Sequence, residues 1–195
     1  MEEQPKDNAR PEPTSSPEVK KAKTQIEEGR LCYRQGQFEQ ALAHFKAAYE
    51  QYAAAGEKSL QAEVANDIGV VHTVLQHWQE ADKYLNQAHQ IFTDLEDLSG
   101  EAQTLGNLGS MFRARGDLKQ AAANLQLASD RFHLVGDNER RAATLKVLSM
   151  VRLSQFRILQ ALAAYDAALA CNPKPSGLQK FLRWIISLPL RLLSH

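Results

Sequence analysis

Residues 115–121 read Arg-Gly-Asp-Leu-Lys-Gln-Ala, and a stretch of this kind occurs four times in the chain at a spacing of forty residues. The other copies are Gln-Gly-Gln-Phe-Glu-Gln-Ala at 35–41, Leu-Gln-His-Trp-Gln-Glu-Ala at 75–81 and Gln-Phe-Arg-Ile-Leu-Gln-Ala at 155–161. A fixed internal period is the signature of proteins built from stacked structural repeats. The sequence therefore predicts one repeat domain over residues 18–173, with units at about 18–56, 57–96, 97–136 and 137–173.

Each unit is predicted to form two helices. Apolar residues recur at intervals of three and four, and a strand-like alternation is absent. Residues 18–172 also contain no proline, which suits uninterrupted helices. We therefore expect an all-α fold.

Small residues occupy fixed places in both helices of each unit. The first helix has Gly29, Gly69, Gly109 or Ser149, and the second has two alanines seven apart: Ala41 and Ala48, Ala81 and Ala88, Ala121 and Ala128, Ala161 and Ala168. A glycine inside a helix costs about 1 kcal/mol relative to alanine. Close packing of the two helices would offset that cost, so we expect these residues to lie at their contact.

This pattern resembles the tetratricopeptide repeat (TPR) family, in which Leu-Gly is followed by Ala-x-x-x-Phe. The matching pairs are Leu108-Gly109 and Ala41-x-x-x-Phe45, and the resemblance covers residues 22–173. The forty-residue period is similar to the repeats of the Leu-Gly-Asn spindle-orientation scaffold and of kinesin light chain. The resemblance implies a right-handed α-solenoid whose first helices line a concave groove.

The family's usual role implies a non-catalytic adaptor or scaffold that binds a protein or peptide segment in this groove. The family's inward positions fall on Lys23, Arg30, Tyr33, Asn66, Thr73, Gln103, Asn107, Ser110, Arg113 and Lys146. The family's clamp for acidic C-termini is not expected, because its positions hold Ile26, Arg30 and Asp67. The identity of the partner is left open.

Charge is unevenly distributed along the repeats. Residues 65–104 contain seven acids and one base, whereas residues 105–144 contain four acids and six bases. This asymmetry either serves solubility or sets the direction in which a peptide lies in the groove.

The two ends of the chain differ in character. Residues 1–17 are proline-rich and nearly devoid of apolar side chains, so we expect a disordered tail. Residues 177–195 form a predicted amphipathic helix with a narrow basic stripe, which Pro189 should kink or end. Three roles remain open for this helix: a cap on the last repeat, a peripheral membrane anchor, or a surface for self-association. The side chains expected to make such contacts are Phe181, Trp184, Ile185 and Leu188.

Composition argues against several other functions. Net charge is zero with 23 basic and 23 acidic residues, which gives no electrostatic basis for nucleic-acid binding. No apolar run is long enough to span a bilayer. The six histidines lack metal-ligand spacing, and we expect His72 and His77 on different sides of a helix end. Cys32 and Cys171 are expected to be buried free thiols. No motif of a catalytic or cofactor site appears, so we expect a protein without enzymatic activity, cofactor or metal. Two cysteines cannot form a disulfide framework, so we expect the protein in the reducing cytoplasm.

Overall fold

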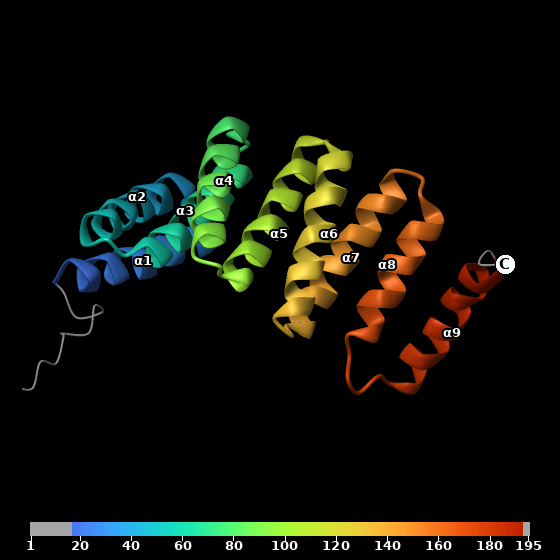
Figure 1. Cartoon of the computed structure of the whole chain (residues 1–195). Helices are drawn as coiled ribbons and strands as arrows, with labels where there is room; N and C mark the ends of the chain where they lie inside the picture. Colours follow the sequence, from blue (N-terminus) through green and yellow to red (C-terminus); the bar gives the residue numbers. More distant parts are fainter. Residues whose placement is uncertain (1–16, 193–195) are drawn as a thin grey trace, which may run out of the picture.

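The structure is a computed structural model that describes residues 17–192, with side chains through Ile186. These residues form nine α-helices and no strand, and the helices stack in chain order from one end of the molecule to the other (Figure 1). The helices are α1 (Pro17–Arg34), α2 (Phe38–Ala55), α3 (Lys58–Val74), α4 (Trp78–Asp94), α5 (Leu98–Arg115), α6 (Leu118–Leu134), α7 (Asn138–Ser154), α8 (Ile158–Ala170) and α9 (Gly177–Leu192). The predicted all-α class is confirmed. The predicted tail lies outside the described residues except for Pro17, which begins α1.

The seven turns that connect α1 through α8 share one backbone geometry, which recurs every twenty residues. The residue at the bend has a positive φ at Gly36, Gly56, Gln76, Glu96, Gly116, Gly136 and Phe156. In this conformation the amide of the next residue donates a hydrogen bond to a carbonyl near the end of the preceding helix. One example is His77 N, which donates to His72 O at 2.9 Å. Equal turns orient successive helix pairs alike, and this regularity produces the solenoid.

The two helices of a repeat approach most closely at the glycines of the first helix. A Cβ added to Gly69 would lie 2.6 Å from Leu85 Cγ and 3.2 Å from the Leu85 backbone nitrogen. A Cβ added to Gly109 would lie at the same two distances from Leu125 Cγ and the Leu125 backbone nitrogen. At Gly29 the added atom would lie 2.7 Å from the Phe45 ring. The alanines that recur seven apart in the second helices are at most 5% exposed: Ala41, Ala48, Ala81, Ala88, Ala121, Ala128, Ala161 and Ala168.

In the fourth repeat, a serine takes the place of the glycine at the contact between the two helices. This residue is Ser149, and its hydroxyl donates a hydrogen bond to the Ala161 carbonyl across the helix pair at 2.8 Å. A hydrogen bond of this kind contributes about 0.5–1.5 kcal/mol to stability.

Buried polar side chains join helices both within a repeat and between neighbouring repeats. Glu101 on α5 is 6% exposed and accepts a hydrogen bond from Arg131 on α6 at 2.8 Å. Asn107 Nδ2 donates to Asn66 Oδ1 at 2.9 Å, so α3 and α5 are linked directly as well as through α4. Most other contacts join helices adjacent in sequence.

Helix α9 begins after a polar turn in which Gln179 N donates to Ser176 Oγ at 3.2 Å. It packs on α8, and Arg183 Nε donates to Asp166 Oδ1 at 2.9 Å. Of the two effects predicted for Pro189, a kink or an end of the helix, the end is wrong, because α9 continues to Leu192. None of the described helices is both long and apolar enough to span a membrane.

Candidate binding groove

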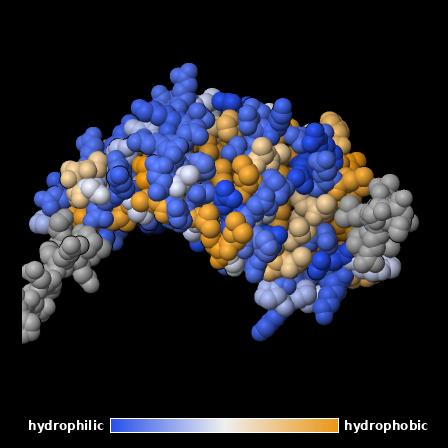
Figure 2. Space-filling view, viewed as in Figure 1, coloured by the Kyte–Doolittle hydropathy of each residue, from blue (hydrophilic) through white to orange (hydrophobic). Residues whose placement is uncertain are grey.

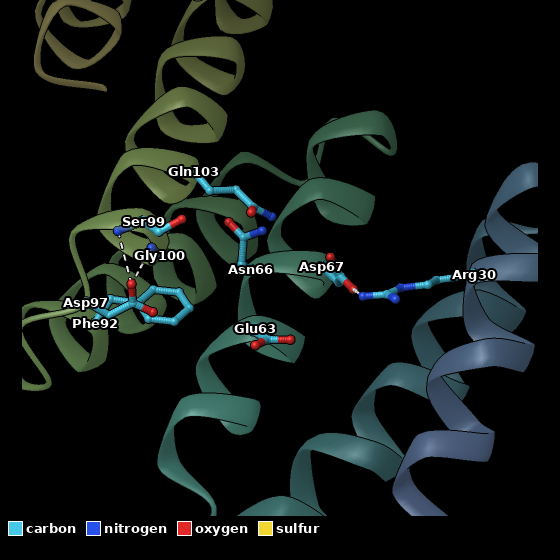
Figure 3. Close-up of a pocket in the computed structure, with 9 residues that line it drawn as sticks. All are labelled: Arg30, Glu63, Asn66, Asp67, Phe92, Asp97, Ser99, Gly100 and Gln103. Carbon is cyan, nitrogen blue, oxygen red and sulfur yellow. Dashed lines mark hydrogen bonds and ion pairs between the residues drawn. The ribbon is translucent and has the colours of Figure 1, made fainter. Parts of the chain in front are cut away.

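Helices α1, α3 and α5 lie side by side and enclose a cavity of about 270 Å³, with the α4–α5 turn as its end wall. A buried water needs about 10–15 Å³, so this cavity has room for a side chain. We call it the acidic cavity. Figure 3 shows its lining residues, which are Arg30, Glu63, Asn66, Asp67, Phe92, Asp97, Ser99, Gly100 and Gln103.

Three carboxylates and one guanidinium set the charge of the acidic cavity. Arg30 Nη2 lies 3.3 Å from Asp67 Oδ2, so this cation is already paired. Asp97 caps the N-terminus of α5, and its Oδ1 accepts hydrogen bonds from the Ser99 and Gly100 amides at 3.0 Å each. Among the described residues, Glu63 has no hydrogen bond or ion pair, and the cavity therefore carries an excess of negative charge.

Burial is the main influence on the pKa of two of these carboxyls. Burial raises the pKa of Asp67 above its ordinary value, and the charge of Arg30 opposes the rise only in part. Burial also raises the pKa of Glu63, and the nearby charge of Asp67 raises it further. Both carboxyls would be stabilised in their charged form by an additional cation.

Asn66 lies at the floor of the acidic cavity and is only 2% exposed. Its Oδ1 accepts the hydrogen bond from Asn107, which fixes the orientation of the amide group. No described residue accepts a hydrogen bond from Asn66 Nδ2. This nitrogen is not among the fully buried polar atoms that lack a partner, so it borders the open space of the cavity and can donate to an acceptor from outside the chain.

Further cavities continue along the odd-numbered helices. One of about 80 Å³ shares Arg30 and Asp67 with the acidic cavity. Another, of about 240 Å³, shares Gln103 with it and leads past Ser110 to α7. The largest, of about 830 Å³, lies between α7 and the α8–α9 connection. Together they follow one face of the solenoid, and we call this series of cavities the trough.

The structure brings seven of the ten predicted groove residues into the trough. The seven that line a cavity are Arg30, Tyr33, Asn66, Gln103, Asn107, Ser110 and Lys146. Lys23, Thr73 and Arg113 lie on α1, α3 and α5 outside these four cavities. Asn66 was predicted as a groove residue, and its near-complete burial was not foreseen.

Sequence reasoning missed the end wall of the acidic cavity. Phe92 lies near the end of α4, Asp97 in the turn that joins the second and third repeats, and Ser99 and Gly100 at the start of α5. The usable signal was Asp97-Leu-Ser-Gly100, an N-cap residue followed by small residues. Gly100 is required because an added Cβ would lie 2.3 Å from the Phe92 ring.

The prediction that separates His72 from His77 is wrong. His72 is 4% exposed, its Nδ1 lies 3.3 Å from the Nδ1 of His77, and its ring stacks on Tyr84 with centroids 5.8 Å apart. The positive φ of Gln76 explains the contact, because that bend folds His77 back over the last turn of α3.

Two further chemical features of the described residues concern thiols and metals. Cys171 is buried, but Cys32 is only partly buried, so the expectation of two buried thiols is wrong for Cys32. Among residues 17–192, no three histidine, cysteine, aspartate or glutamate side chains are placed to hold a metal ion.

The outer side of α9 is an apolar surface, which we call the α9 face. It consists of Leu178, Phe181, Trp184 and Ile185, whose exposed fractions range from 43 to 73%. The rings of Phe181 and Trp184 are stacked with centroids 6.1 Å apart. Apolar surface is visible toward the C-terminal end of the solenoid in Figure 2. Leu188, the fourth predicted contact residue, lies outside the described side chains.

Solved structures of other repeat proteins superpose on this solenoid. A kinesin light chain from Podosopora anserina with nearly identical TPR-like repeats matches with a TM-score of 0.70 at 13% identity, over 94% of this chain and 90% of that one. The protein BtubC from P. vanneervenii matches with a TM-score of 0.68 at 18% identity, over 88% of this chain and 72% of that one. At such identities the likeness concerns the fold.

Sequence comparison identifies a bacterial relative and a family. Regulatory protein RapG of Bacillus subtilis is 30% identical over 111 residues, which are 56% of this chain and 30% of that protein. The match thus spans less than a third of the regulatory protein. A model of the tetratricopeptide repeat family matches residues 21–94 and 100–174. Because these residues make up most of the chain and form the helix pairs described above, the chain belongs to the tetratricopeptide repeat family.

Proposed function

We propose that the chain is a non-catalytic interaction module that binds an extended segment of a partner protein in the trough. The observation that carries this proposal is the continuity of the cavities, since Gln103, Arg30 and Asp67 each line two of them. A row of connected cavities can take successive side chains of one peptide. Tetratricopeptide repeats are in general protein-binding scaffolds, which agrees with this role.

A peptide selection tests the proposal on the full chain. Peptides of random sequence displayed on phage are selected for binding, and hydrogen exchange then locates the enriched peptides on the protein. We expect protection on α1, α3, α5 and α7. Protection confined to the even-numbered helices, or no enriched peptide, would contradict the proposal.

A pair of tryptophan variants provides the matched control. Gly106 lines the trough, and an added Cβ there meets no atom within 4 Å, so Gly106→Trp should obstruct the trough without disturbing the fold. Ala123 is an exposed residue of α6 outside the cavities. Gly106→Trp should weaken peptide binding at least about tenfold, a change of about 1.4 kcal/mol, whereas Ala123→Trp should leave it unchanged.

We propose as a second function that the α9 face attaches the solenoid to the surface of a membrane in the cytoplasm. The inner side of α9 is held on α8 by the pair of Arg183 and Asp166, so capping and membrane contact use opposite sides of one helix. No acidic residue follows Asp166. Exposed aromatic and aliphatic side chains beside lysine and arginine are typical of helices that lie in a membrane interface.

Flotation with liposomes distinguishes the three roles left open for α9. We expect the full chain to float with vesicles of phosphatidylcholine and phosphatidylserine, and Phe181→Ser/Trp184→Ser to lose flotation. Leu127→Ser/Leu134→Ser is the control, because both leucines are exposed on α6. No flotation by the full chain would contradict the proposal. An increase in mass with concentration in light scattering, abolished by Phe181→Ser/Trp184→Ser, would instead indicate self-association.

A further inference from the structure

We infer that the acidic cavity is a subsite for a lysine or arginine side chain of the segment bound in the trough. This inference rests on the proposed function and names the chemistry of the ligand at one position. The cavity holds the carboxylates of Glu63, Asp67 and Asp97 against the single cation of Arg30. A ligand that enters must therefore bring positive charge.

The fixed contacts in the cavity define where that charge is needed. Asp67 is paired with Arg30 at 3.3 Å, so Arg30 is not available to hold an anion. Asp97 uses Oδ1 for the two amides at the start of α5. Glu63, which pairs with none of the described residues, faces the same space (Figure 3). Glu63 and Asp97 are thus the carboxylates best placed to meet a ligand cation.

Asn66 is a second, independent indication of a ligand. Its side chain is almost completely buried, it lies between Gln103 and Glu63 at the cavity floor (Figure 3), and its Nδ2 has no acceptor among the described residues. A main-chain carbonyl of a bound peptide supplies such an acceptor. The peptide backbone would then cross the cavity near Asn66 and direct one side chain toward Glu63 and Asp97.

The remaining wall suits the aliphatic part of a lysine or arginine side chain. Phe92 lines the cavity and is 4% exposed, and the absence of a side chain on Gly100 lets the α4–α5 turn close against its ring. Lysine and arginine pack their methylene groups on apolar surfaces while their charged ends remain with polar partners.

Peptides from the phage selection test the inference on the full chain. We expect the enriched peptides to share one basic position. Replacing that residue by norleucine should weaken binding to the wild type about tenfold or more, as measured by fluorescence polarisation, because close charge pairs at interfaces have coupling energies of this order. The same replacement should have little effect on binding to Glu63→Gln/Asp97→Asn.

The control variant is Glu80→Gln/Asp117→Asn, in which Glu80 is an exposed residue of α4 outside the cavities of the trough. It removes the same charges, and Asp117 caps α6 as Asp97 caps α5, but neither residue lines the acidic cavity. Replacing the basic residue of the peptide by norleucine should weaken binding to the control variant as much as it weakens binding to the wild type. Asparagine retains an N-cap acceptor, so both variants are expected to fold, and circular dichroism verifies this.

The outcomes separate this inference from the proposed function. Peptides that protect the trough but share no basic position would overturn the inference alone. An equal norleucine effect in Glu63→Gln/Asp97→Asn and the wild type would do the same. Failure to enrich any peptide, or protection outside the trough, would overturn both.

Discussion

At the residue scale, the contact between Gly69 and Leu85 sets how closely α3 and α4 approach. An added Cβ would meet both the side chain and the backbone nitrogen of Leu85, and the backbone cannot move aside as a flexible side chain would. We expect Gly69→Ala to destabilise the protein by about 1–3 kcal/mol through overpacking, although alanine is the better helix former. Urea unfolding followed by circular dichroism measures the change.

Gly106 is the matched comparison for that prediction. It lies inside α5, but an added Cβ there meets nothing within 4 Å. Gly106→Ala should therefore stabilise the protein by up to about 1 kcal/mol, the difference in helix propensity. Stabilisation by both variants would show that helix propensity, and not the approach of two helices, determines the result.

The buried His72 gives the protein a pH dependence of stability. Burial lowers the pKa of His72, and the charges of Lys46 and His77 lower it further. The unfolded chain therefore binds the proton more tightly. The contribution of neutral His72 is complete above the unfolded pKa of about 6.5 and is lost as the pH falls from there through the folded pKa.

We expect His72→Phe to reduce the loss of stability between about pH 7.5 and 5.5. The equivalent residue of the third repeat is Phe112, forty positions later, so phenylalanine suits this place in the fold. Thermal unfolding of the variant and the wild type across this range is the measurement. His89→Gln, a change on α4 outside the pair, should retain the wild-type slope, and an unchanged slope in His72→Phe would refute the assignment.

The individual residues show what the sequence could reveal. The forty-residue period located Gly69 and Gly109 because their role repeats in every unit. The burial of Asn66 and the pairing of His72 with His77 are particular to one repeat and depend on distances between helices. No periodicity contains that information, so neither could be predicted.

At the element scale, α9 is held more weakly than the repeat helices, since its contact with α8 is smaller than any contact between successive repeat helices. Its polar attachment is the pair of Arg183 and Asp166, both partly exposed, and such pairs contribute up to about 1 kcal/mol. We expect Asp166→Asn to speed hydrogen exchange of the α9 amides and leave α1–α6 unchanged.

The comparison variant for α9 is Asp130→Asn, an exposed residue of α6 with no contact to that helix. It should leave exchange in α9 at the wild-type rate. Equal exchange of α9 in Asp166→Asn and the wild type would mean that apolar contacts alone hold the helix. Loss of protection throughout the solenoid would mean that α9 is an essential cap.

Helix boundaries were predictable where local chemistry fixes them. Asp97, Asp117 and Asp137 each accept amide hydrogen bonds at a helix start, and all three stand at turns that the repeat spacing located. The positive φ of Gln76, Glu96 and Phe156 was not predictable from residue type, because the repeat geometry imposes a conformation that these residues disfavour. Pro189 shows the opposite case, because a strong local signal for the end of a helix did not decide where α9 ends.

At the scale of the whole molecule, the free energy of unfolding is approximately a sum of contributions from the repeats and from the interfaces between neighbouring repeats. Nearly all strong contacts join helices adjacent in sequence, whereas the acidic cavity uses residues 30–103 only. In such a solenoid, removal of a terminal repeat should lower stability without abolishing the fold of the others.

We therefore expect a chain that ends at Gly136 to keep α1–α6 and the acidic cavity. Its helical content per residue should stay close to that of the full chain, because the Asn66–Asn107 contact between its second and third repeats and the Glu101–Arg131 contact within its third repeat both remain. Its free energy of unfolding and its denaturant m-value should both fall, since less surface is buried. The face of α6 around Leu125, which packs against α7 in the full chain, becomes exposed, so circular dichroism and urea unfolding are measured at low protein concentration. A chain ending at Pro175 should give intermediate values, and complete loss of helicity on removal of the fourth repeat would show that the solenoid folds as one indivisible unit.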